Sequence, residues 1–295
     1  MVEQLSKLSQ FIEKHLLLLL LGKPCNLQHK ITVLSSTKML DALAEAHTEL
    51  HNSIPDITKY PVLGNKDSIL SELDELERKV KPLLNSKEDL LDTEIHSLKA
   101  YAKLQYEVGD YEGCANVLEE LRRANERDYW GEIMVSILLG RKEDAQHLIE
   151  EFQTNTNDLR DKAWILHLTL FTAFPESPAF FFEIANMTKF SNTIEVACPH
   201  LLRYLIAAAL VKKPGKLVEI FLNNKSLLKN DPALEAFDEL FESYDVEKSI
   251  KLLEKFNDEV KKDHFLEGIS DKLVLEAKSF LMFCQSKLCK KTQNA

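Results

Sequence analysis

Hydrophobic and polar positions recur with helical spacing along almost the whole chain. From about Asp92 onward, amphipathic segments of roughly 12 to 18 residues follow one another, separated by turns of about two to four residues. Three turns share one pattern, in which a helix ends, an acidic residue follows and a small residue lies on the next helix. They are Tyr106 to Cys114, Ile137 to Ala145 and, less clearly, Phe241 to Ser249. No segment reads convincingly as a strand, so the pattern predicts an all-α fold.

The spacing of these turns predicts a helical-repeat arm. Gly109 and Gly140 are 31 residues apart, which is close to the period of about 34 residues in tetratricopeptide repeats. Each helical hairpin would leave an apolar face that only the next hairpin can cover, so the hairpins stack as a solenoid. We expect a right-handed solenoid of tetratricopeptide or HEAT type over residues 92–288, followed by a tail at residues 289–295.

The run from Leu16 to Leu21 is the most apolar part of the N-terminal region. Six leucines are too few to span a bilayer, which takes about 20 apolar residues. Glu13, Lys14 and His15 directly precede the run, which argues against a secretory signal. We expect these leucines to end one of the helices within residues 1–53, buried either in the chain's own core or against a neighbouring chain. The candidate partner contacts are Leu16, Leu17, Leu19 and Leu20.

Residues 54–91 are expected to hold a linker and one amphipathic helix. Before them, Ser36 has the position of an N-cap for a helix from Thr37 to His51. Two prolines and a glycine predict a linker or loop over residues 54–66, and Pro82 should kink or end the helix that follows. The apolar residues of that helix form a single stripe among charged residues: Ile69, Leu73, Leu76, Val80 and Leu83.

Composition narrows the possible functions. The 295-residue chain is 45% hydrophobic, contains only 8 Gly and 9 Pro, and has a formal net charge of −10. Nothing in it forces the basic face that a free nucleic-acid binder normally carries. The five cysteines include no C-x-x-C pair, so neither a zinc ribbon nor a redox dithiol is indicated. An odd number of cysteines without a signal peptide fits a reducing compartment, and we expect a cytoplasmic protein.

Two sets of residues could carry chemistry. His47 and His51 are four residues apart on one predicted helix, but a metalloprotease motif needs its glutamate directly after the first histidine, and here Glu49 comes one position later. We interpret this pair as a polar helix face. Cys198 and His200 could be a nucleophile and a base, yet on a helix two residues apart they would diverge by about 200°.

Pro199 is well placed in the first turn of a helix, so the interpretation of Cys198 and His200 that we favour is the start of a packed helix. His167 is expected to be a hydrogen-bonded core histidine, with Trp164 as a packing anchor. The sequence holds no phosphate-binding loop and no nucleophile elbow. We predict no catalytic residue, no cofactor and no metal ligand.

Seven short segments of unusual sequence occur in order along the chain. They are Lys14 to Leu17, Leu34 to Asp41, Tyr106 to Cys114, Tyr129 to Glu132, Ala163 to His167, Cys198 to Leu205 and Asp263 to Leu266. Together they resemble the family of the E subunit of eukaryotic translation initiation factor 3, and Ala163 to His167 and Cys198 to Leu205 carry most of the weight. We treat eight of their residues as the structural signature: Trp130, Trp164, His167, Cys198, Pro199, His200, Arg203 and Tyr204.

The resemblance implies a PCI-type scaffold subunit, in which a helical-repeat arm is followed by a winged-helix domain. Such a protein would act with other subunits of initiation factor 3 on the 40S ribosomal subunit and support mRNA recruitment. It would have no catalytic residues, would bind no membrane and would have no small-molecule substrate. The chain departs from the pattern at its end. After a last helix expected from His264 to Leu288, only Cys289 to Ala295 follow, so we expect the winged helix to be missing.

Three alternatives remain. One is a PCI-type subunit of the proteasome lid or the COP9 signalosome. The amino-acid sequence of residues 198–205 argues against it. Another is a free tetratricopeptide-like adaptor, which would need a set of basic and amide side chains to clamp a peptide carboxylate, and we cannot assemble one. An enzyme based on Cys198 and His200 ranks last.

Overall fold

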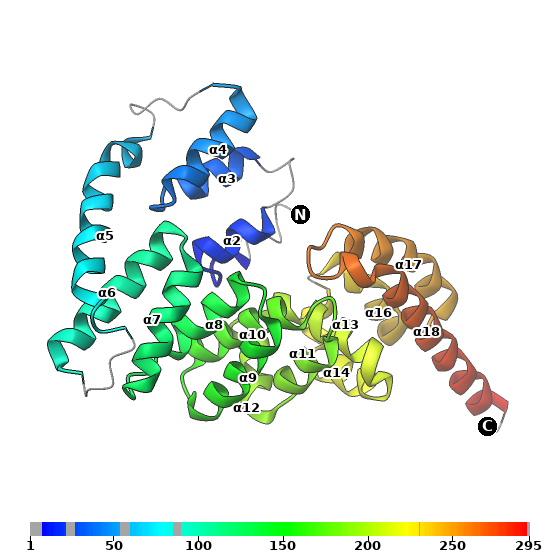
Figure 1. Ribbon diagram of the computed structural model, residues 1–295. Coiled ribbons are helices and arrows are strands. Elements are labelled where there is room, and N and C mark those ends of the chain that lie inside the picture. The colour runs from blue at the N-terminus through cyan, green and yellow to red at the C-terminus, as the bar shows by residue number, and fades with distance from the viewer. Residues whose placement is uncertain (1–7, 22–26, 54–59, 85–89, 230, 294–295) are drawn as a thin grey trace. The chain divides into compact units, whose positions relative to one another are not determined.

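The computed structural model describes residues 8–21, 27–53, 60–84, 90–229 and 231–293 (Figure 1). Within these residues the regular structure consists of 17 α-helices and short 3₁₀ turns, without strands. This confirms the predicted all-α, helical-repeat fold, whereas the handedness of a solenoid stays a prediction. The chain forms two compact units, one made of residues 12–148 and the other of residues 1–11 and 149–295. The division into an N-terminal region, a linker region, an arm and a tail also stays a prediction.

The unit of residues 12–148 contains consecutive short helices. They are α2 (Lys14–Leu20), α3 (Leu27–Leu34), α4 (Leu40–His51), α5 (Lys66–Val80), α6 (Asp92–Val108), α7 (Tyr111–Arg123), α8 (Tyr129–Leu138) and the first part of α9 (Lys142–Phe152). The 3₁₀ turn Pro61–Asn65 leads into α5. The predicted stripe of α5 is correct, because Ile69 and Val80 are buried and the leucines between them pack on the α6–α7 core. Part of the predicted loop, residues 54–59, lies outside the described residues.

The predicted repeat turns have a common local structure. Gly109 and Gly140 both adopt left-handed backbone angles, with φ of 93° and 72°, which glycine reaches without steric cost. Directly after Gly109, the carboxylate of Asp110 accepts a hydrogen bond from the backbone N–H of Gly113 at 2.9 Å. A glycine that ends one helix and an aspartate that caps the next thus build the turn between α6 and α7.

The unit of residues 149–295 holds the remaining helices. They are α10 (Leu159–Ala173), α11 (Pro178–Ala185), α12 (Thr188–Val196), α13 (Leu202–Lys212), α14 (Leu217–Asn223), α15 (Lys225–Leu228), α16 (Glu235–Ser243), α17 (Val246–Lys261) and α18 (Ser270–Gln293). The third predicted turn joins α16 and α17, where Tyr244 takes the left-handed position with φ of 59°. Phe180 to Phe182 lie on α11, as their helix-compatible neighbours predict.

Two helices of this unit are buried almost all round. On α10 every residue from Ile165 to Ala173 is buried, and on α13 every residue from Leu202 to Leu210 is buried. A helix that is apolar on all sides must be covered on all sides, so these two helices form the centre of the unit. The segment that begins at Cys198 leads directly into α13.

Two details of the helix boundaries differ from expectation. Ser36 is not an N-cap, because α4 begins at Leu40 and the Ser36 hydroxyl donates back to the carbonyl of Val33 at 2.7 Å. A hydroxyl that bonds backward closes the turn of the preceding helix instead of capping the next one. The last helix starts at Ser270, after a 3₁₀ turn at Glu267–Ile269, and continues to Gln293.

Candidate functional site

The segment from Cys198 to Leu205 lies at the joint between α12 and α13. Cys198 is the residue before a 3₁₀ turn at Pro199–Leu201, and α13 begins at Leu202. Pro199 occupies the first position of that turn, where its missing N–H leaves no hydrogen bond unmade. The predicted helix start is therefore confirmed. Cys198 itself is not on a helix, so the divergence of about 200° that we inferred from helical geometry does not describe it.

Cys198 is placed for packing and not for nucleophilic attack. Its thiol is fully buried and lies 3.3 Å from the carbonyl oxygen of Thr193, to which it donates. Burial raises the pKa of this thiol to about 12. A thiol held neutral in an apolar setting is unreactive, because the thiolate is the nucleophile.

His200 pairs with the other histidine that the sequence singled out. Nε2 of His200 lies 2.8 Å from Nε2 of His167, and Nδ1 of His167 lies 2.6 Å from the carbonyl oxygen of Ala163. His167 is completely buried, and the ring of Phe11 stacks on it with centroids 4.5 Å apart. Burial lowers the pKa of His167 to about 3. The prediction of a hydrogen-bonded core histidine is confirmed, and its partner is the histidine of the signature segment.

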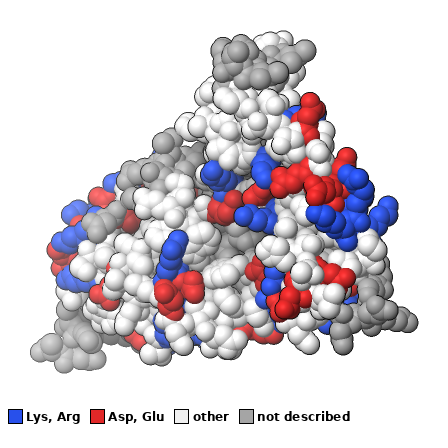
Figure 2. Space-filling model, turned by 90° about the vertical axis from the view of Figure 1, so that its left-hand side faces the viewer, with Lys and Arg blue, Asp and Glu red and all other residues white. Residues whose placement is uncertain are grey.

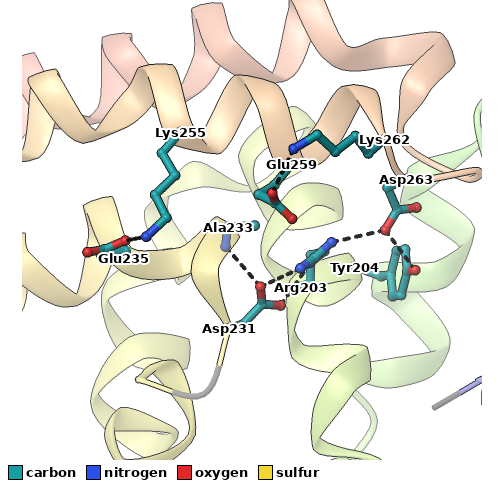
Figure 3. Close-up of polar contacts among 9 residues, drawn as sticks. All are labelled: Arg203, Tyr204, Asp231, Ala233, Glu235, Lys255, Glu259, Lys262 and Asp263. Atoms are coloured by element: carbon teal, nitrogen blue, oxygen red, sulfur yellow. Dashed lines mark hydrogen bonds and ion pairs between the residues drawn. The ribbon is translucent and has the colours of Figure 1, made fainter. Parts of the chain in front are cut away.

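Arg203 is the centre of a buried ion network, which Figure 3 shows. Its Nε donates to Asp231 at 2.8 Å and its Nη2 donates to the other oxygen of the same carboxylate at 2.5 Å. Its Nη1 lies 3.3 Å from Asp263. The Arg203 side chain is only 5% exposed. Because a charge is rarely buried unless it is paired, this network fixes α13 to the start of the α16–α17 hairpin and to the turn after α17.

Tyr204 completes the network from the next position of α13. Its hydroxyl donates to Asp263 at 2.9 Å, and its ring packs edge-on against Phe265 with centroids 5.8 Å apart. The other oxygen of Asp263 accepts the backbone N–H of Phe265 at 3.0 Å. Burial raises the pKa of Asp263, although Arg203, Tyr204 and the backbone donors act in the opposite direction. The segment 198–205 is thus an intramolecular hub, with every polar contact described above made inside its own unit.

The N-terminal leucines divide into two groups. Leu16 and Leu20 are buried, whereas Leu19 is 41% exposed and Leu17 is half-buried. Leu16 and Leu20, four residues apart, lie on the face of α2 that packs in its own unit. Contact of the four leucines with a partner stays a proposal.

A polar cluster docks α2 against the α6–α7 hairpin. Glu13 accepts a hydrogen bond from the hydroxyl of Tyr106 at 2.7 Å, and Nδ1 of His15 lies 2.8 Å from the hydroxyl of Tyr111. The His15 and Tyr106 rings stack with centroids 4.5 Å apart. Burial lowers the pKa of His15, which keeps the imidazole neutral in this contact. Sequence reasoning missed this cluster.

The remaining residues that the sequence singled out are His47, His51, Trp130 and Trp164. Nδ1 of His47 lies 3.0 Å from the carbonyl of Ser53, and the rings of His47 and His51 are 4.6 Å apart. The described residues include no group of three or more His, Cys, Asp or Glu side chains that could hold a metal ion. Trp130 on α8 and Trp164 on α10 are both half-buried.

The surface carries charged side chains of both signs (Figure 2), and one pair of helices is unusually apolar. On the face shown in Figure 2, basic and acidic side chains are interspersed. One exposed ion pair joins Arg123 and Glu119 at 2.7 Å. In the described part of the chain no single helix has the length and hydropathy to cross a membrane. The bent pair Thr188–Val196 and Pro199–Lys212, at 114° to each other, meets the criteria together.

Asp231 and Asp263 are the residues of the hub that sequence reasoning did not connect to it. Each had a signal. Asp231 precedes Pro232, the usual arrangement of a capping residue and a helix start, and its carboxylate does accept the backbone N–H of Ala233 at 2.9 Å. Arg203 within a nearly uninterrupted apolar helix also implies carboxylate partners somewhere in the fold.

Comparison with known proteins gives consistent matches. No protein-family model matches the chain. Proteins named as the E subunit of eukaryotic translation initiation factor 3 are similar to it. That of Schizosaccharomyces pombe is 26% identical, over 86% of this chain and 62% of the relative. That of Arabidopsis thaliana is 25% identical, over 81% and 64%, and that of Bombyx mori 23%, over 95% and 77%. The resemblance seen in the sequence is confirmed, and the chain spans less than two thirds of the first two relatives.

Proposed function

We propose that this chain, which resembles the E subunit of eukaryotic translation initiation factor 3 over most of its length, is a component of that complex. The observation that carries the proposal is the extent of the similarity, which covers 95% of this chain in the Bombyx mori relative. Within this chain, the hub of residues 198–205 joins helices of a single unit. The proposed role is therefore that of a non-catalytic scaffold in the cytoplasm.

The geometry supports a scaffold because the polar groups that could have been reactive are engaged in holding helices together. Arg203 joins α13 to two other parts of its unit, and His200 satisfies the buried ring of His167. A rigid arm of this kind suits a protein whose work is to position neighbours. By the family resemblance, those neighbours are other subunits of initiation factor 3, and through them the 40S particle and mRNA.

The proposed contact with a neighbouring subunit includes the outward side of α2. Leu19 is a large apolar residue that is 41% exposed, whereas Leu17, about 200° away around the helix, is half-buried. The buried core of an interface is more apolar than the rest of the surface, so we assign Leu19 to a partner contact and Leu17 to a second contact on another side of α2.

Sedimentation in a sucrose gradient tests the proposed function. A cell lysate of the source organism, with the chain tagged, is fractionated after formaldehyde fixation. The proposal predicts that the tagged chain sediments with 40S particles and with other initiation factor 3 subunits, and that its depletion lowers the polysome fraction. Sedimentation with the proteasome lid or the COP9 signalosome would contradict it, and so would a chain found solely at the top of the gradient.

A further inference from the structure

The region from Lys212 to Lys225 combines exposed apolar and basic side chains in a chain that is otherwise acidic. These 14 residues contain four lysines and one glutamate, whereas the whole chain has a net charge of −10. They cover the end of α13, a 3₁₀ turn at Pro214–Lys216, α14 and the first residue of α15 (Figure 1). The lysines are Lys212, Lys213, Lys216 and Lys225, and all four are exposed.

Two large apolar side chains stand between these lysines. Val218 and Leu222 are four residues apart on α14, so they share one face of the helix. Val218 is 41% exposed and Leu222 is 64% exposed, while the opposite face of α14 is buried through Leu217, Ile220 and Phe221. Scattered exposed leucines are ordinary. An exposed apolar pair within a lysine-rich segment, however, suits a ligand that carries both apolar and acidic side chains.

The turn before α14 is open, and the ion pair next to it is exposed. Gly215 has no heavy atom within 4 Å of the position of an added Cβ, so the turn is open. Lys216 reaches Glu219 at 2.7 Å, but both side chains are about half exposed, at 48% and 58%. An ion pair this exposed is held weakly. A stronger carboxylate partner could therefore exchange with Glu219.

From this combination we propose that the exposed face of α14, together with the four lysines that flank α14 in the sequence, binds an acidic amphipathic segment of another protein. Apolar side chains of the segment cover Val218 and Leu222, and its Asp and Glu side chains face the four lysines. The inference deepens the proposed function, on which it rests for the identity of the partner: another component of the same complex.

Two other classes of ligand fit the surface less well. Single-stranded RNA binds by stacking bases on exposed aromatic rings, and the exposed large apolar residues here are aliphatic. A membrane-surface helix needs a long apolar face, and α14 has seven residues. Both classes remain distinguishable outcomes of the test.

The test uses the full chain with p-benzoylphenylalanine in place of Leu222, purified with its partners from cells and irradiated. The same replacement at Leu275 is a matched control, because Leu275 is also 64% exposed but lies on α18. We expect the position-222 crosslink to map by mass spectrometry to a protein segment in which Asp and Glu outnumber Lys and Arg and which carries apolar residues.

Charge variants test the proposed attraction between the lysines and the acidic segment. Lys216→Glu with Lys225→Glu should lower the crosslink yield at position 222 by about fivefold or more, since reversed rim charges weaken and slow association. Lys216→Arg with Lys225→Arg should keep it. Raising KCl from 0.1 M to 0.5 M should also lower the yield, because salt screens exposed charges. Circular dichroism confirms that each variant is folded.

The inference is overturned if position 222 crosslinks to RNA, to lipid, to a neutral or basic segment, or to nothing. It is also overturned if folded charge-reversed protein gives an unchanged yield. Failure of the proposed function is seen separately in the same sample. If initiation factor 3 subunits co-purify and no acidic segment crosslinks, the docking inference alone is wrong. If an acidic segment crosslinks in a preparation without those subunits, the proposed function alone is wrong.

Discussion

Nε2 of His167 and Nε2 of His200 lie 2.8 Å apart, although 33 residues separate them in the sequence. Nδ1 of His167 lies 2.6 Å from the carbonyl oxygen of Ala163, so that nitrogen carries the proton and Nε2 is the acceptor. His200 must therefore donate. His200 thus supplies the hydrogen-bond donor that the buried imidazole of His167 on α10 requires.

Replacing His200 by alanine should destabilise the protein by about 1 to 3 kcal/mol, because Nε2 of His167 would remain buried without its donor. Urea unfolding followed by circular dichroism at pH 7.5 measures the change. His96→Ala is the control, since His96 is exposed on α6. A loss for His200→Ala no larger than that of the control would contradict the pairing.

Stability should also depend on pH through His167. Its pKa falls from 6.5 to about 3 on burial, so as the pH drops the unfolded chain binds a proton before the folded one does. The contribution of His167 is therefore complete above pH 6.5 and is lost progressively below it. Unfolding free energies at pH 7.5, 6 and 5 should fall more steeply for the natural protein than for His167→Gln, which has no titrating group. Parallel curves would show that His167 is not held neutral.

Arg203→Met should cost about 3 to 5 kcal/mol, because it leaves the buried carboxylate of Asp263 and the half-buried carboxylate of Asp231 without their cation. Arg141→Met is the matched control. Arg141 also contacts a carboxylate, that of Glu112 at 2.6 Å, but the two side chains are 45% and 65% exposed, so its loss should be below about 1 kcal/mol. Denaturant midpoints of both variants decide the comparison. Equal effects would mean that the buried network does not hold the unit together.

Sequence reasoning predicted the helices better than the contacts between them. Helical spacing, Gly109 and Gly140 located the repeat turns, since those signals are local. The hub could not be assembled, because Arg203 meets Asp231 and Asp263 from 28 and 60 residues away. Helical geometry was the wrong reason for rejecting a Cys198–His200 dyad, although the favoured structural interpretation holds: Cys198 precedes the helix, and its burial keeps the thiol neutral.

Cys198 should resist alkylation in the folded protein. Burial raises the pKa of the Cys198 thiol to about 12, so little thiolate is present at pH 8. Cys284 on α18 is only partly buried and should react first with iodoacetamide. Mass spectrometry of the tryptic peptides over time gives both rates. Rapid labelling of Cys198 under native conditions would contradict the packing role and would restore the enzyme hypothesis.

Substitutions at two leucines of α2 should affect folding and complex assembly separately. Leu16→Asp places a charge at a completely buried position and should collapse the melting temperature. Leu19→Asp changes a residue that is 41% exposed, so it should leave the melting temperature within about 2 °C, as surface changes usually do, while weakening recovery of partner subunits. Thermal melts and quantitative pull-downs measure the two effects. Full recovery of partners with Leu19→Asp would remove α2 from the interface.

Affinity purification of the tagged chain from its source organism, with quantitative mass spectrometry, tests the central claim most directly. We predict that other initiation factor 3 subunits are recovered in near-stoichiometric amounts, and that 40S ribosomal proteins accompany them at lower yield. Recovery of proteasome-lid or COP9 signalosome subunits in those amounts, or of the chain without any initiation factor 3 subunit, would contradict the account.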